Sequence, residues 1–178
     1  MRAVLDACVL YPTATRTLLL AAAEAGVLTP VWSARILEEW ARAMARGGAA
    51  SEAATRAEIA ALEARWQASV VPRVLEHDLP DADDTHVLGA CLAGGADTLV
   101  TRNLRDFPLR RLTPLGVART DPDSLLLGLV RDGLALAEQA EAMRRAAGWS
   151  GDLRSFLKRA GLPRLGKHLC GAALAARG

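Results

Sequence analysis

Residues 79–108 read LPDADDTHVLGACLAGGADTLVTRNLRDFP, and this stretch decides the fold. Several acids crowd its start, and an apolar helical pattern over residues 87–92 then ends at Gly94 and Gly95. A short apolar run, residues 98–100, follows and gives way to a polar loop. The order predicts a helix, a turn, a buried strand and a loop, as in a parallel α/β sheet.

Polar residues of this stretch are expected to meet at one edge of that sheet. Loops at the carboxyl ends of parallel strands carry the functional site, so Asn103 and Asp106 would lie there. A helix that enters from the same edge would place Asp84 beside them. Carboxylates brought this close repel one another unless a cation lies between them, and Mg²⁺ is a hard cation that takes such oxygen ligands. The sequence therefore predicts a divalent-cation site.

A further acid, Asp6, ends the first apolar run of the chain. Residues 2–7 predict a short buried strand with this carboxylate at its carboxyl end. An acid in that place can equally cap the next helix or a turn, so Asp6 alone does not indicate a function.

Another acid, Glu39, lies on a helix predicted over residues 33–46, with Ser33 as its cap. A turn of about 100° per residue places Glu39 at the edge of the apolar stripe and Glu38 nearly opposite it. Glu39 can therefore reach inward, whereas Glu38 should face water. Taken alone, Glu39 is more simply a surface acid paired with Arg35 or another nearby arginine.

The remaining elements follow from the same patterns, and the chain after residue 121 is expected to form a helical appendage. Further strands are expected over residues 27–32 and 70–75 and near residues 115–118, and further helices over residues 13–25 (capped by Thr13), 51–68, 123–147 (two or more), 153–160 and 165–176.

Length and composition indicate one compact domain with an appendage. The chain has 178 residues, of which 51% are hydrophobic and 24% charged. No apolar run approaches the roughly 20 residues that a membrane span needs. Because Asp6 comes too early for a signal peptide, we expect a cytoplasmic protein that does not contact the membrane.

The cysteines and histidines suggest no metal cluster of their own. Cys8, Cys91 and Cys170 are odd in number and widely spaced, which favours reduced thiols over disulfides or a zinc site. His77 and His86 flank the acids and either could be a ligand or a proton shuttle, but a surface histidine near a loop is the commoner case.

Charge is unevenly distributed along the chain. Residues 1–106 carry a net charge of −4, and residues 107–178 carry +6. Basic residues near an acidic metal site could steer a polyanion towards it. A compositional bias explains the pattern equally well, because arginine outnumbers lysine by 20 to 2.

Four segments in this order resemble the PIN-domain ribonucleases and, within them, the VapC-type toxins of toxin–antitoxin pairs. The segments are residues 4–6, 33–40, 81–84 and 96–107. The resemblance implies a three-layer α/β/α domain with a central, mainly parallel sheet over residues 1–120, and a helical carboxy-terminal extension over residues 121–178. It also implies hydrolysis of RNA phosphodiester bonds, a homodimer and a cognate antitoxin protein as partner.

Roles for individual residues follow from the same resemblance. Carried over by position, Asp6, Glu39, Asp84 and Asp106 are the catalytic acids. Asp6, Asp84 and Asp106 would hold one or two Mg²⁺ or Mn²⁺ ions, and Asn103 and Asp81 would be accessory residues. One departure is Cys8, because many relatives have Asn, Ser or Thr there, so a polar contact near the metal would be missing.

Other functions compete with this interpretation. A haloacid-dehalogenase phosphatase needs a second Asp where Cys8 stands, and a receiver domain needs adjacent acids where Ala7 follows Asp6. A catalytically weak PIN domain that binds RNA or protein is the alternative that survives. Asp81, Asp83 and Asp84 would stabilise the start of a helix through its dipole whether or not a metal binds.

Overall fold

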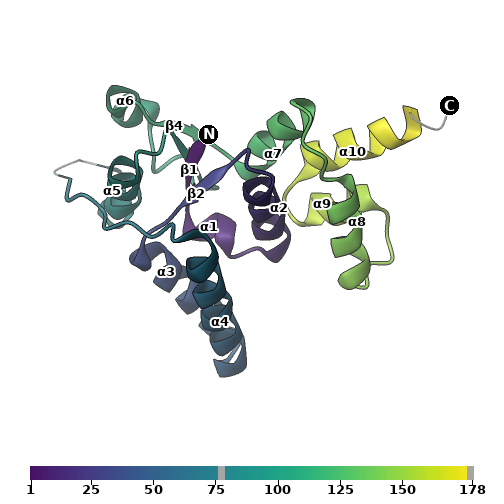
Figure 1. Cartoon of the computed structure of the whole chain (residues 1–178), viewed down its shortest axis with the longest axis horizontal. Helices are drawn as coiled ribbons and strands as arrows, with labels where there is room; N and C mark the ends of the chain where they lie inside the picture. The colour runs from purple at the N-terminus through teal and green to yellow at the C-terminus, as the bar shows by residue number, and fades with distance from the viewer. Residues whose placement is uncertain (76–78, 176–178) are drawn as a thin grey trace. The chain divides into compact units, whose positions relative to one another are not determined.

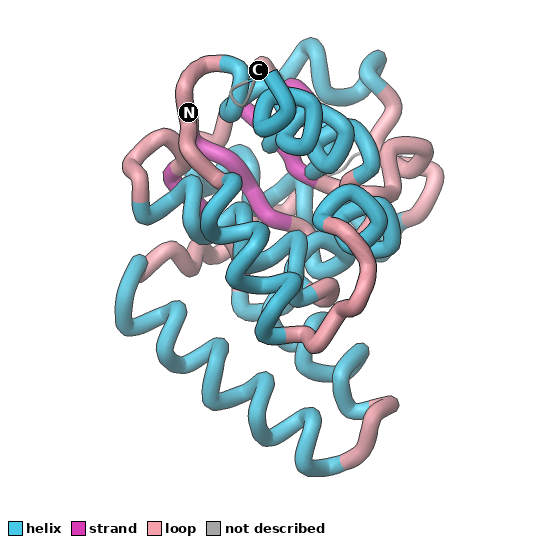
Figure 2. Tube along the Cα trace, turned by 90° about the vertical axis from the view of Figure 1, so that its right-hand side faces the viewer, coloured by secondary structure: helices cyan, strands magenta, loops and turns pink. Residues whose placement is uncertain are grey.

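The structure, a computed structural model that describes residues 1–75 and 79–175, contains a sheet of short parallel strands. In this part of the chain one sheet has four strands in the order β2-β1-β3-β4, all of them parallel. The strands are β1 (Arg2–Leu5), β2 (Thr29–Val31), β3 (Thr98–Val100) and β4 (Ala118–Thr120). Figure 2 shows these short strands in magenta among the far longer helical segments.

Helices account for most of the other described residues. They are α1 (Ala7–Leu10), α2 (Thr13–Glu24), α3 (Ala34–Ala45), α4 (Ala49–Trp66), α5 (Thr85–Gly94), α6 (Leu109–Leu112), α7 (Pro122–Arg131), α8 (Ala137–Ala146), α9 (Leu153–Arg159) and α10 (Pro163–Ala175), with 3₁₀ turns η1 (Ala82–Asp84) and η2 (Thr113–Leu115). Figure 1 labels the elements.

Burial explains the strands at the centre of the sheet. Val4 and Leu5 of β1 and Leu99 and Val100 of β3 are fully buried. A parallel strand that is covered on both faces reads as a continuous apolar run, and these segments do so. Helix α5 contacts β1, β2 and β3. The sheet flanked by helices, with further helices at the carboxyl end, confirms the predicted α/β/α class.

The chain divides into two compact units. The first comprises residues 1–11 and 29–120, and the second comprises residues 12–28 and the chain from Asp121 onward. Helix α2 contacts α7 and α8, which explains why residues 12–28 group with the second unit. In that unit Asp123 is 2% exposed and accepts the backbone N–H groups of Arg164 and Leu165, both at 2.9 Å. This carboxylate therefore fastens the start of α10 to α7.

Ser33 caps α3 as predicted, because its Oγ accepts the Ile36 N–H at 3.3 Å. The Glu38 side chain is 37% exposed, as predicted for a residue that faces water. Its carboxylate pairs with Arg42 at 3.1 Å and with Arg56 of α4 at 2.8 Å. Helix α4 lies alongside α3 and supplies the partner that the α3 pattern alone does not reveal (Figure 1).

Two strand predictions are wrong: one predicted strand does not form, and the other lies a few residues later than predicted. Residues 70–75 form no strand; a single parallel bridge joins Ser69 to Trp32, and Val71 and Val74 are 88% and 98% exposed. An exposed edge segment gains too little from burial to extend the sheet. The last strand starts at Ala118, because the η2 turn ends at Gly116 with a left-handed φ of 70°.

Smaller differences concern the ends of elements. Pro12, not Thr13, occupies the cap position of α2, and Thr13 is its first helical residue. Residues 76–78, including His77, and residue 176 of the last predicted helix lie outside the described residues. Among the described residues, no helix combines the length and the apolar character needed to cross a membrane.

Candidate active site

Asp6 and Thr101 meet because β1 and β3 pair in parallel. The register joins Leu5 to Val100, so the next residue of each strand emerges at the same edge of the sheet. Thr101 Oγ1 donates a hydrogen bond of 2.6 Å to Asp6 Oδ2, and Asp6 is only 8% exposed. Since β1 lies between β2 and β3, the strand order reverses here, and such a point is where open parallel sheets bind ligands.

Cys8 provides the polar contact that the sequence suggested would be missing. Its Sγ donates to Asp6 Oδ2 at 3.0 Å and accepts the Arg102 N–H at 3.1 Å. Burial, together with the negative charge of Asp6, raises the pKa of Cys8 to about 12. The thiol therefore stays protonated and acts as a donor to the carboxylate.

Asp84 is the acid most strongly affected by its neighbours. It is the last residue of the η1 turn, which Asp81 caps by accepting the Asp83 N–H on Oδ1 at 2.9 Å. Burial raises the pKa of Asp84 to about 6, and the charges of Asp6, Asp81 and Asp106 act in the same direction. Its Oδ2 is buried and has no hydrogen-bond partner among the described residues.

Asp106 is held by the loop that follows β3. Thr101 Oγ1 accepts the Asn103 N–H at 3.0 Å, and the Asn103 side-chain amide donates to Asp106 Oδ2. Arg119 on β4 donates to the carbonyl oxygens of Leu104 and Phe107, the latter at 2.6 Å. The loop that carries Asn103 and Asp106 is thereby tied to the neighbouring strand.

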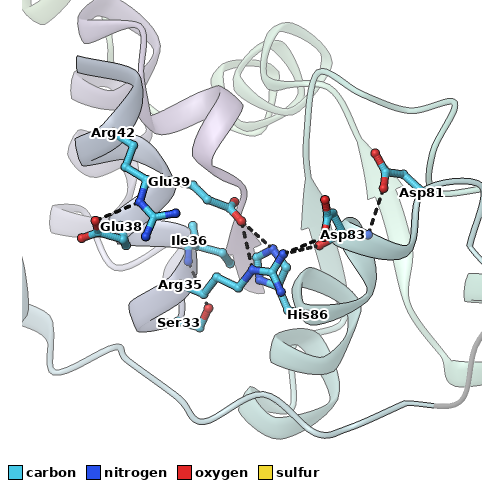
Figure 3. Close-up of polar contacts among 9 residues, drawn as sticks. All are labelled: Ser33, Arg35, Ile36, Glu38, Glu39, Arg42, Asp81, Asp83 and His86. Atoms are coloured by element: carbon cyan, nitrogen blue, oxygen red, sulfur yellow. Dashed lines mark hydrogen bonds and ion pairs between the residues drawn. The ribbon is translucent and has the colours of Figure 1, made fainter. Parts of the chain in front are cut away.

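Glu39 is held by two donors, as Figure 3 shows. Its Oε1 lies 3.0 Å from His86 Nε2 and 3.2 Å from Arg35 Nε. Burial acts to raise the pKa of Glu39, but the hydrogen bonds and charges of His86 and Arg35 outweigh it and lower the pKa. Arg35 also contacts Asp83 Oδ1 at 3.3 Å, which links α3 to the turn before Asp84.

Sequence reasoning missed the role of His86 in this contact. Its side chain is 9% exposed, so it is not a surface histidine. The sequence around His86 gives no sign of this contact, because its partner Glu39 lies on a different helix. Thr101 was also missed, since a hydroxyl in a polar loop gives no sign of the carboxylate that it contacts.

The structure brings most of the predicted site residues together within the first unit. Asp6, Asp81 and Asp106 all act electrostatically on Asp84, and Glu39 joins this group through His86. Asp81 and Asn103 are exposed at its margin.

The group fits a hard divalent cation in its chemistry but is not preassembled as a ligand set. Within the described ranges, no three His, Cys, Asp or Glu side chains are arranged to hold a metal ion. Asp6, Glu39 and Asp106 are engaged by internal donors instead. The donors are nevertheless hard oxygens, and a cation would satisfy Asp84 Oδ2 and relieve the repulsion among the acids.

Comparison with known proteins identifies the family. The sequence profile of the PIN domain matches residues 2–105, which is more than half of the chain and includes Asp6, Glu39 and Asp84. No curated protein and no solved structure matches the chain. The matched segment contains β1, β2 and β3 and ends one residue before Asp106, and the chain therefore belongs to the PIN-domain family.

Proposed function

We propose that this protein is a divalent-metal-dependent endoribonuclease that hydrolyses RNA phosphodiester bonds. PIN domains are generally nucleases and generally use divalent metal ions. The observation that carries the proposal is Asp84, whose buried Oδ2 has no hydrogen-bond partner in the part of the chain that the structure describes and whose charge is opposed by Asp6 and Asp106. A site with this excess of negative charge suits a cation and the phosphate that the cation attracts.

Asp6, Asp84 and Asp106 would hold Mg²⁺ or Mn²⁺ at the carboxyl edge of the sheet. When bound, such an ion supplies a nucleophile at neutral pH and offsets the charge that develops on the transferring phosphate. Hard carboxylate oxygens favour these ions over zinc.

The chain's own residues orient the acids. Thr101 and Cys8 both donate to Asp6 Oδ2, which turns the other oxygen of Asp6 away from these donors. Asn103 holds Asp106 in the same way. Glu39 lies at the edge of the group, where it can accept a proton or orient water.

The test is cleavage of a structured RNA by purified protein with Mg²⁺, Mn²⁺ or EDTA. We expect metal-dependent cleavage that falls at least about 100-fold in Asp84→Asn and in Asp6→Asn. Asp97→Asn is the matched control, because Asp97 precedes the same strand, β3, at the opposite edge of the sheet. Cleavage that persists in EDTA, or that both variants retain, would contradict the proposal.

A second candidate is a catalytically weak PIN domain that binds RNA or protein. The internal donors on Asp6, Glu39 and Asp106, and the lack of a preassembled ligand set in the described residues, favour it. Binding without cleavage of any RNA tested, in the presence of either metal, would select this alternative.

The biological role that we propose is that of a toxin in a toxin–antitoxin pair, acting as a homodimer. This proposal is supported only by the resemblance to VapC-type toxins. It predicts that the small protein encoded by the neighbouring reading frame copurifies with this chain and suppresses its RNA cleavage. Sedimentation of the purified chain as a monomer would contradict the homodimer.

A further inference from the structure

Both donors to Glu39 bind the same oxygen atom. His86 Nε2 and Arg35 Nε each contact Oε1, and within residues 1–75 and 79–175 no hydrogen bond or ion pair involves Oε2. Two donors on one oxygen fix the rotation of a carboxylate, which leaves the second oxygen available in a defined direction. The two donors differ in the solvent exposure of their side chains.

His86 is the better placed of the two. Its side chain is 9% exposed, whereas that of Arg35 is 50% exposed and is shared between Glu39 and Asp83. Exposed ion pairs contribute little because water competes for both partners. A hydrogen bond shielded from water is stronger. The contact from His86 should therefore decide the orientation of Glu39.

The position of His86 also explains how Glu39 comes near the other acids. His86 lies in the first turn of α5, two residues after Asp84, whereas Glu39 lies on α3. Figure 3 shows His86 reaching from α5 to the Glu39 carboxylate. The hydrogen bond thus joins the helix that follows Asp84 to the helix that carries Glu39.

We propose that His86 is a positioning residue that acts through Glu39, holding its carboxylate so that Oε2 faces the reacting groups. This inference rests on the proposed nuclease function. A carboxylate can only accept, so the contact requires a proton on Nε2. The role needs a donor at this point, not an imidazole as such.

The first test compares His86→Gln with His86→Leu. The glutamine amide nitrogen can reach the place of Nε2, whereas leucine fills the space without a donor. We expect His86→Leu to lower kcat for RNA cleavage by about 10- to 100-fold with KM unchanged, as is typical when a supporting hydrogen bond is lost. His86→Gln should stay within about threefold of the wild type. His168→Leu, on α10 of the second unit, is the control and should keep the wild-type kcat.

The second test asks whether the effect passes through Glu39. In a Glu39→Gln background, His86→Leu should lower kcat by less than about twofold further, because two residues that act as one unit are not additive. Equal losses in both backgrounds would overturn the inference. Equal kcat values for His86→Gln and His86→Leu would also overturn it, provided that both variants unfold within a few degrees of the wild type.

A measurement without RNA separates this inference from the proposed function. Because Glu39 would orient water held by the cation, we expect the Mn²⁺ affinity, measured by calorimetry, to fall by about tenfold in His86→Leu and to be unchanged in His86→Gln. If the wild type cleaves no RNA but Mn²⁺ affinity follows this pattern, the nuclease proposal fails and the positioning role stands. If the wild type cleaves RNA and His86→Leu matches it in both measurements, only the positioning role fails.

Discussion

Asp84 is the residue whose environment most clearly opposes its charge. Its pKa is about 6 in the folded protein against an ordinary value of 3.8, first because of burial and then because of Asp6, Asp81 and Asp106. The folded state thus favours the protonated form. Protonated Asp84 therefore stabilises the folded state, and this contribution is complete below about pH 3.8 and is lost as the pH rises through about 6.

This shift predicts that Asp84→Asn stabilises the metal-free protein at neutral pH. After discounting for solvent screening at a half-buried site, we expect about 1 kcal/mol, or a Tm increase of about 2–4 °C at pH 7. The difference should shrink towards pH 4, where wild-type Asp84 is protonated in the folded protein. Thermal unfolding in EDTA between pH 4 and pH 7 measures it, with exposed Asp132→Asn as the control. A Tm difference that is constant with pH would show that the charge of Asp84 does not destabilise the fold.

Cys8 should resist alkylation although it lies beside the candidate site. The pKa of its thiol is raised to about 12, and the thiolate is the form that attacks iodoacetamide. At pH 8 we expect Cys8 to react at least ~100-fold more slowly in folded protein than in urea, measured by mass spectrometry of the labelled peptide. Buried Cys91, whose pKa is also raised to about 12, is an internal reference. Equal labelling of Cys8 in both states would show that the thiol does not donate to Asp6.

At the scale of elements, residues 70–75, which precede the η1 turn, pack against α5 without forming a strand. Arg73 N donates to the carbonyl oxygen of Gly89 at 3.1 Å, and a Cβ on Gly89 would clash with the Arg73 carbonyl oxygen. The backbone carbonyl of Arg73 cannot move aside to make room for this Cβ as the end of a flexible side chain could. Glycine is therefore required at this point of α5 for close approach.

Gly89→Ala should accordingly destabilise the protein by about 1–3 kcal/mol, because the segment or the helix must shift. Gly128→Ala is the matched control. Gly128 is also helical, a Cβ there would meet nothing within 4 Å, and alanine should stabilise α7 by about 0.5–1 kcal/mol. Urea unfolding gives both values. Similar effects of the two substitutions would mean that residues around Arg73 do not contact α5.

At the scale of the whole molecule, the residues of the candidate site belong to one compact unit. Asp6 comes from residues 1–11, and Glu39, Asp84 and Asp106 come from residues 29–120. Folding of this unit brings negative charges together, so a cation that binds them should raise the stability of the folded chain.

We expect Mg²⁺ at about ten times its Kd to stabilise the wild type by about 1.4 kcal/mol, or to raise its Tm by about 3–6 °C. Asp84→Asn should lose most of this increase, because it removes the acid whose Oδ2 has no hydrogen-bond partner among the residues described. Differential scanning calorimetry measures the effect, with NaCl at matched ionic strength as the control for general screening. An equal rise in wild type and variant would show that Mg²⁺ binds elsewhere.

The sequence by itself determined the class of fold and the chemical character of the site. Buried parallel strands such as β1 and β3 appear as continuous apolar runs, and the acids that follow them lie at one edge of the sheet. The cap at Ser33 and the end of α5 at Gly95 were also predictable, since each depends on a few adjacent residues.

Only the tertiary structure decided which donors hold the acids. Thr101 bonds Asp6 across 95 residues of sequence, and His86 on α5 reaches Glu39 on α3. The partner of Glu38 on α4 and the failure of residues 70–75 to form a strand were likewise outside the local pattern. The physical reason is that hydrogen bonds and edge pairing depend on which segments become neighbours, whereas periodicity and capping depend only on neighbours along the chain.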